Sequence, residues 1–98
     1  MSDYLNIQTL HRVLREGGYI SFTSRLKWQE RFRDHHVYES HISESGVSIY
    51  PLSRYTFSIP KRNEILADVQ RVLKEAGLNC KASQHDILVP WTQTAGAA

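Results

Sequence analysis

Apolar residues recur at helical spacing in two segments, one early in the chain and one late. The first set is Leu5 or Ile7, Leu10, Val13 and Leu14, and the second is Ile65, Leu66, Val69, Val72, Leu73 and Ala76. Residues three and four positions apart share one face of a helix. The pattern predicts one helix that begins at a Ser2 or Asp3 cap and ends at Gly17, and another that runs from Pro60 to Gly77.

Short runs rich in β-branched and aromatic residues predict the strands. The predicted strands are 19–23, 37–42, 47–50, 55–59, 78–82 and 86–89. The Ser43-Glu44-Ser45-Gly46 sequence has the composition of a turn between two of them, and 83–85 is a second predicted turn. Pro51 cannot donate a backbone hydrogen bond, so the strand that begins at Val47 is predicted to end there or to lie at a sheet edge.

The segment 24–36 supports two interpretations. Its residue types favour a helix, and Trp28 and Phe32 would share a face of that helix. Its alternation of apolar and polar residues continues the pattern of 19–23 and slightly favours a strand. In a strand, the polar positions of this stretch would emerge on the same face as Tyr19.

These elements predict an α+β fold. We expect a single small domain over 1–91, with a mostly antiparallel sheet of four to six strands and two amphipathic helices packed on one face. Residues 92–98 have little to bury and are predicted to form a mobile C-terminal tail. A chain of 98 residues with 41% hydrophobic and 22% charged residues is typical of one folded globular domain.

The chain has no recognisable targeting or membrane segment. Met1 is followed by polar residues, without the basic and apolar regions of a secretory signal or a run long enough to span a bilayer. Cys80 is the only cysteine, which excludes an internal disulfide. We therefore expect a cytoplasmic protein that has no membrane partner.

Histidines and carboxylates cluster around residue 36, and they are the one indication of a metal site. The members are Asp34, His35, His36, Glu39 and His41. Their spacing matches neither a structural zinc site nor a zinc-protease helix. A small metal-binding domain is therefore kept only as an alternative, and we predict no metal ligand and no cofactor.

No catalytic motif is present in the sequence. It contains no nucleophile elbow, no phosphate-binding glycine loop and no dinucleotide fingerprint, since Gly17-Gly18 follows a predicted helix and does not precede one. We predict that the protein is not an enzyme.

Basic residues concentrate in the segment that follows the first predicted strand. The net charge is only +2, but a strand there would place Arg25, Lys27, Arg31 and Arg33 beside Tyr19 on one sheet face. Cations bind phosphates and an aromatic ring stacks on bases, so this face is a candidate surface for RNA, DNA or another partner. Direct nucleic-acid binding is the alternative to a protein partner.

The function that remains is binding through shape. We predict a non-enzymatic regulator or inhibitor that docks on a protein or nucleoprotein complex. The candidate aromatic anchors are Tyr4, Tyr38, Tyr50, Tyr55 and Trp91, of a type enriched at interfaces. An edge strand such as 47–50 would also allow a homodimer. Small accessory proteins of phages and plasmids, such as anti-CRISPR proteins, offer an analogy of size and simplicity alone.

Overall fold

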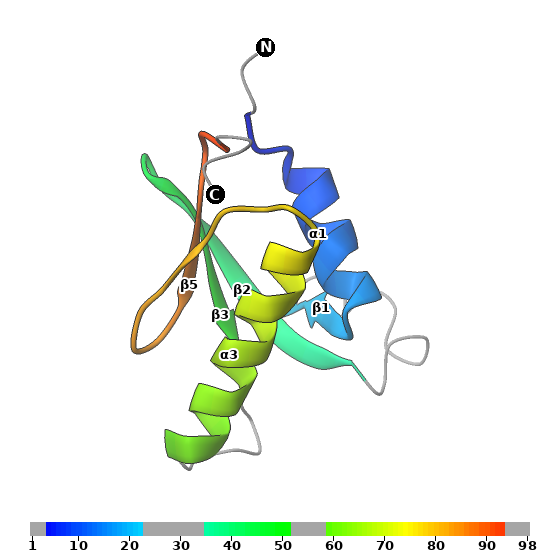
Figure 1. Cartoon of the computed structure of the whole chain (residues 1–98), viewed down its shortest axis with the longest axis vertical. Helices are drawn as coiled ribbons and strands as arrows, with labels where there is room; N and C mark the ends of the chain where they lie inside the picture. The colour runs from blue at the N-terminus through cyan, green and yellow to red at the C-terminus, as the bar shows by residue number, and fades with distance from the viewer. Residues whose placement is uncertain (1–3, 23–34, 52–58, 94–98) are drawn as a thin grey trace.

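The computed structural model describes residues 4–22, 35–51 and 59–93. It is an α+β domain whose five described strands form one mostly antiparallel sheet, with helices α1 and α3 lying against one face (Figure 1). The elements are α1 (Ile7–Glu16), β1 (Tyr19–Ser21), β2 (His36–Ile42), β3 (Gly46–Pro51), α3 (Ile59–Glu75), β4 (Lys81–Ala82) and β5 (Ile87–Pro90). The predicted fold class is confirmed.

Helix α1 begins later than the sequence predicted. Its cap is Asn6, whose side chain accepts a hydrogen bond from the backbone N–H of Thr9 at 3.2 Å. Leu5 precedes the helix, and its N–H donates to the carbonyl of Trp91 at 2.7 Å. This bond holds the chain extended before α1, while Ser2 and Asp3 lie outside the described residues. At the other end, Gly18 has the positive φ of 97° that glycine favours.

Helix α3 buries the apolar face that its sequence predicts. The buried residues are Ile65, Leu66, Val69, Val72 and Leu73. Ala76 is exposed and lies one residue beyond the end of the helix. The predicted strand 55–59 lies outside the described residues except at Ile59, which is the first helical residue, so the prediction was wrong at that position.

The sheet has the strand order β1-β2-β3-β5-β4, and only β1 and β2 run parallel. The predicted hairpin is confirmed, with β2 and β3 joined through residues 43–46. Strand β3 ends at Pro51, as one of the two predictions from this proline had it. It lies between β2 and β5, so the other prediction, of a free edge at 47–50, was wrong. Pro51 has no N–H to donate to a neighbouring strand. None is needed on the β5 side, because β5 pairs with β3 only as far as Ile49.

The core lies between the sheet and the two helices. Buried sheet residues on this side are Tyr19, Tyr38, Val47, Ile49, Ile87 and Val89, and they join Leu10, Leu14 and the apolar face of α3 in one cluster. Gly46 permits β3 and β5 to approach, since its φ is 150° and a Cβ there would overlap the carbonyl of Val89. Ile20 is only 2% exposed although it points to the opposite face from Tyr19.

Two residues of the predicted C-terminal tail, Thr92 and Gln93, make contacts within the described fold. Gln93 is 8% exposed, and its side chain accepts from the N–H of Asn79 at 2.6 Å and donates to the carbonyl of Pro90 at 2.8 Å. Thr92 forms a β-bridge with Tyr4. Thr92 and Gln93 are thus part of the fold, whereas the rest of the predicted tail lies outside the described residues.

Within 4–22, 35–51 and 59–93, neither helix combines the length and apolar character needed to cross a membrane.

Candidate interaction surface

The basic residues predicted to bind a partner fall in a part of the chain that the structure does not describe. Arg25, Lys27, Arg31 and Arg33 all lie outside the described residues, so their common surface stays a prediction. Tyr19 is the one member of that set whose position the structure gives.

Tyr19 lies in the core and not on an open sheet face. It is 3% exposed, and its hydroxyl donates to Oδ2 of Asp68 on α3 at 2.5 Å. Alternation placed Tyr19 with the polar residues of the segment, but a phenol whose hydroxyl reaches a hydrogen-bond acceptor can occupy the helix-covered face. In this position the ring is not available for base stacking, which corrects the role given to Tyr19.

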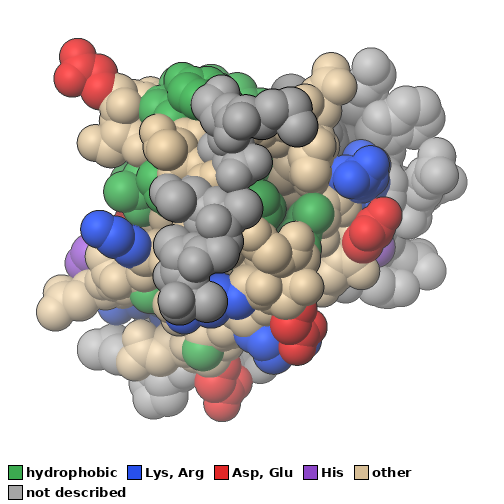
Figure 2. All heavy atoms as spheres, turned by 45° about the horizontal axis from the view of Figure 1, so that its top comes forward, with side chains coloured by type: hydrophobic (Ala, Val, Ile, Leu, Met, Phe, Trp, Pro, Cys, Tyr) green, Lys and Arg blue, Asp and Glu red, His purple; other side chains and the backbone are tan. Residues whose placement is uncertain are grey.

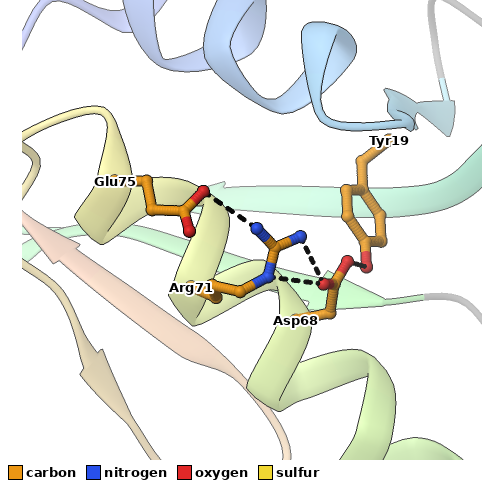
Figure 3. A network of polar contacts seen from close by, with 4 residues as sticks. All are labelled: Tyr19, Asp68, Arg71 and Glu75. Atoms are coloured by element: carbon orange, nitrogen blue, oxygen red, sulfur yellow. Dashed lines mark hydrogen bonds and ion pairs between the residues drawn. The ribbon is translucent and has the colours of Figure 1, made fainter.

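Asp68 links this tyrosine to two charged residues on the surface of α3 (Figure 3). Arg71 donates to Oδ1 of Asp68 at 2.7 Å and to Oε2 of Glu75 at 2.8 Å. The hydrogen bonds from Tyr19 and Arg71 hold the pKa of Asp68 below its ordinary value, and burial raises the pKa of Tyr19. The network therefore stabilises an ionised Asp68 and a protonated Tyr19, an arrangement that fastens β1 to α3.

A second polar pair joins α1 to the sheet. Nδ1 of His11 lies 2.5 Å from the hydroxyl of Tyr38, which is 1% exposed. Burial lowers the pKa of His11, and the nearby Arg15 lowers it further, while burial raises the pKa of Tyr38. A neutral imidazole whose Nδ1 accepts a hydrogen bond from the phenol O–H satisfies both groups. Tyr38 is thus a core residue and not the surface anchor that was one expectation.

The histidines of the possible metal cluster point to different neighbours. Nε2 of His35 lies 3.2 Å from the carbonyl of Arg15, and the ring of His36 lies 5.7 Å from that of Tyr19. His41 contacts Glu39, with Nε2 and Oε2 3.7 Å apart. Among the described residues no three histidine, cysteine or acidic side chains gather as metal ligands.

Exposed apolar side chains gather at the end of the molecule that carries the β2–β3 turn. Tyr4 is 64% exposed and Ile42 is 68% exposed, the two large hydrophobic residues so exposed among those described. The ring of Tyr4 stacks on that of Trp91 at 5.8 Å between centroids, and the indole N–H of Trp91 donates to the carbonyl of Ser43 at 2.7 Å. We call Tyr4, Ile42 and Trp91 the apolar end.

This end of the molecule faces forward in Figure 2, where hydrophobic side chains reach the surface between polar ones. Tyr4 and Trp91 were among the aromatic anchors proposed from the sequence; Tyr50 is half-buried and Tyr55 lies outside the described residues. Ile42 was missed. The only sequence feature that could have indicated its exposure was its place beside a predicted turn, because isoleucine is usually buried.

Cys80 does not have the surroundings of a reactive thiol. It is half-buried, and burial raises its pKa despite the nearby Lys74. A nucleophilic cysteine needs the opposite shift, toward the thiolate.

Comparison with models of protein families, with curated proteins and with solved structures finds no match for this chain.

Proposed function

We propose that this chain is a non-enzymatic binding protein, a small regulator or inhibitor that docks on a protein or nucleoprotein complex in the cytoplasm. The observation that carries the proposal is the exposure of Tyr4 and Ile42 at one end of the sheet. Large apolar side chains gathered at an accessible place are typical of interaction sites.

The apolar end is also held in a fixed arrangement. Trp91 packs against the core and is fixed by its bond to Ser43, and Tyr4 stacks on it with an angle of 6° between the rings. The β-bridge between Tyr4 and Thr92 holds the backbone beneath. A side chain that is already ordered loses less conformational entropy on binding, so these aromatic residues are suited to anchor a partner.

The polar groups of the described core support binding over catalysis. The hydroxyls of Tyr19 and Tyr38 and the imidazole of His11 make pairwise bonds that join helices to strands. Burial raises the pKa of the Cys80 thiol, away from a reactive thiolate. The bonds of the two hydroxyls and the imidazole stabilise the fold and account for the positions of these three groups.

Site-specific photo-crosslinking tests the proposal. The photoreactive residue p-benzoylphenylalanine replaces Tyr4, and in a matched control it replaces His85, which is exposed in the turn between β4 and β5. In cells that naturally make the chain, irradiation should attach a protein to position 4 and not to position 85. Equal labelling at both positions, or none at position 4, contradicts docking at the apolar end.

A further inference from the structure

Strand β2 extends beyond its neighbour β1. The parallel ladder pairs β1 with His36, Val37 and Tyr38, and β1 ends at Ser21. Strand β2 continues to Ile42, and on its other side it pairs with β3 from Tyr38 to Ile42. Within the described residues, no strand covers the outer side of β2 over residues 40–42. We call this stretch the open edge.

The backbone groups of the open edge point outward at two residues. The N–H of Ser43 donates to the carbonyl of Gly46 at 2.8 Å, which fixes the hydrogen-bonded pairs of the hairpin. Such pairs alternate in an antiparallel ladder, so His41 bonds with Ser48 while Ser40 and Ile42 direct their N–H and C=O groups away from β3.

The pairing of β2 with β1 leads to the same directions for the backbone groups of β2. The N–H of His36 donates to the carbonyl of Gly18 at 2.9 Å, so the even-numbered residues of β2 face β1. Beyond Tyr38 these groups have no backbone partner among the described residues, and both Ser40 and Ile42 are exposed. A row of unpaired donors and acceptors on an accessible edge is a template for another strand.

A pocket lies beside the open edge, at the place where β1 stops. Its volume is about 210 Å³, and its lining residues are Ser21, Phe22, Tyr38, Glu39, Ser40 and His41. Pockets for drug-sized ligands usually measure roughly 300–1,000 Å³, so this one suits a single side chain. In strand addition, main-chain bonds supply affinity and pockets for alternate side chains supply specificity.

The residues that line the pocket favour a basic side chain as its occupant. Glu39 supplies a carboxylate, 45% exposed at its side chain and 3.7 Å from His41, and Phe22 is the aromatic residue of the lining whose side chain is not held in the core. A guanidinium group pairs with carboxylates and stacks on aromatic faces, which makes arginine the best match to this combination.

We propose that the open edge binds an extended segment of a partner protein as an added β-strand, with an arginine side chain in the adjoining pocket. This inference rests on the docking function proposed above and names the form of the partner. Ile42 belongs both to the open edge and to the apolar end, so the added strand would continue directly onto that surface.

The length of the open edge excludes a second copy of the chain as the occupant. Three residues of strand span about 10 Å. A stable dimer buries about 800 Å² on each partner, far more than a three-residue ladder supplies. A segment of a larger partner does not face this limit, because the partner also contacts the apolar end.

Nuclear magnetic resonance of the ¹⁵N-labelled full chain tests the inference. The probe is the acetylated and amidated peptide Thr-Val-Arg-Val-Thr, at up to millimolar concentration. We expect the amide signals of Ser40 and Ile42 to shift with peptide, while those of Lys81 and Ala82 on the opposite sheet edge stay in place. A peptide that does not move the Ser40 and Ile42 signals overturns the inference, and so do shifts at those signals on dilution of the chain alone, which would indicate a second copy.

Two control peptides separate the backbone and the pocket contributions. Full N-methylation of the probe removes its donors, and glutamate in place of its arginine reverses the charge; each change should weaken binding at least about tenfold. Equal binding of either control overturns the corresponding part of the proposal.

Two variants of the chain test the edge itself. Ile42→Pro removes the outward N–H and should abolish the shift of the Ser40 amide signal on addition of peptide, whereas Ile42→Thr keeps that N–H and should retain the shift. If Ile42→Pro does not fold, the N-methylated peptide carries the same test.

The two proposals fail in different ways. Crosslinking at Tyr4 with no peptide effect at Ser40 and Ile42 would overturn strand addition and leave docking intact. If neither the crosslink at Tyr4 nor the peptide effect at Ser40 and Ile42 is seen, docking and strand addition are both overturned.

Discussion

The hydroxyl of Tyr19 donates to Oδ2 of Asp68 at 2.5 Å and joins β1 to α3 across 49 positions of sequence. Tyr19→Phe removes the donor and should lower the free energy of unfolding by about 1.5–3 kcal/mol, the range for a hydrogen bond to a charged group. Asp68→Ala leaves a buried hydroxyl without this acceptor and should cost a similar or larger amount. Urea denaturation measures both.

The double variant isolates the contact between these two residues. If the bond is the source of the loss, Tyr19→Phe with Asp68→Ala should cost at least about 0.5 kcal/mol less than the sum of the single variants. Arg71→Ala is the control: its guanidinium is exposed, so it should change stability less than either single variant. Strict additivity would mean that the two side chains do not interact.

The pair formed by His11 and Tyr38 predicts a loss of stability in mild acid. The pKa of His11 is lowered from 6.5 by burial and by Arg15, so the unfolded chain takes up a proton at a pH where the folded chain does not. The free energy of unfolding should therefore fall as pH drops below 6.5, and stop falling below the folded pKa. The groups that face His11 are Tyr38 on β2 and Arg15 on its own helix.

His11→Asn tests this origin of the acid effect. Asparagine places an acceptor near the position of Nδ1 but does not titrate, so its stability curve from about pH 7 to about pH 5 should be flatter than that of the parent. Chemical denaturation at several pH values gives both curves. Parallel curves would assign the acid effect to other groups.

Gly46 is expected to be the most sensitive glycine in the described chain. Gly46→Ala would combine a φ of 150° with overlap against the backbone of Val89 and Pro90, and should cost at least about 2 kcal/mol. Gly77→Ala is the matched control, because Gly77 has a φ of 85° and open space around it; its cost should stay near 1 kcal/mol, the conformational part alone. Thermal unfolding of the two variants compares them, and equal losses would argue against close packing at Gly46.

The sequence predicted the fold class because local patterns determine it. The apolar face of α3 and the turn at residues 43–46 both involve residues close in the chain. The start of α1 was predicted too early because the bond from Leu5 to the carbonyl of Trp91 joins opposite ends of the sequence. The interior position of β3 was missed for the same reason, since strand order depends on distant pairing.

The candidate surface was harder to predict than the fold. Alternation placed Tyr19 with polar neighbours, but it carries no information about a distant acceptor such as Asp68. The position of the Tyr4 ring depends on its stacking against Trp91, a contact between distant residues that a linear pattern cannot show. The open edge exists only because β1 and β2 differ in length once they are paired.

The basic residues at 25–33 permit a direct test of the nucleic-acid alternative. We expect at most weak binding to a single-stranded oligonucleotide at physiological salt, because the net charge is only +2 and Tyr19 is buried. Fluorescence anisotropy at two salt concentrations measures it. Tight, salt-dependent binding that is lost in the Arg25→Glu, Arg31→Glu double variant would favour nucleic acid as the partner.

Hydrogen exchange at two adjacent residues of β2 tests the open edge most directly. The amide of His41 points toward β3 and that of Ile42 points away from it. In the free chain we predict that the Ile42 amide exchanges at least about tenfold faster than the His41 amide. Equal protection of the two amides would show that the outer side of β2 is already covered, and would contradict a docking surface there.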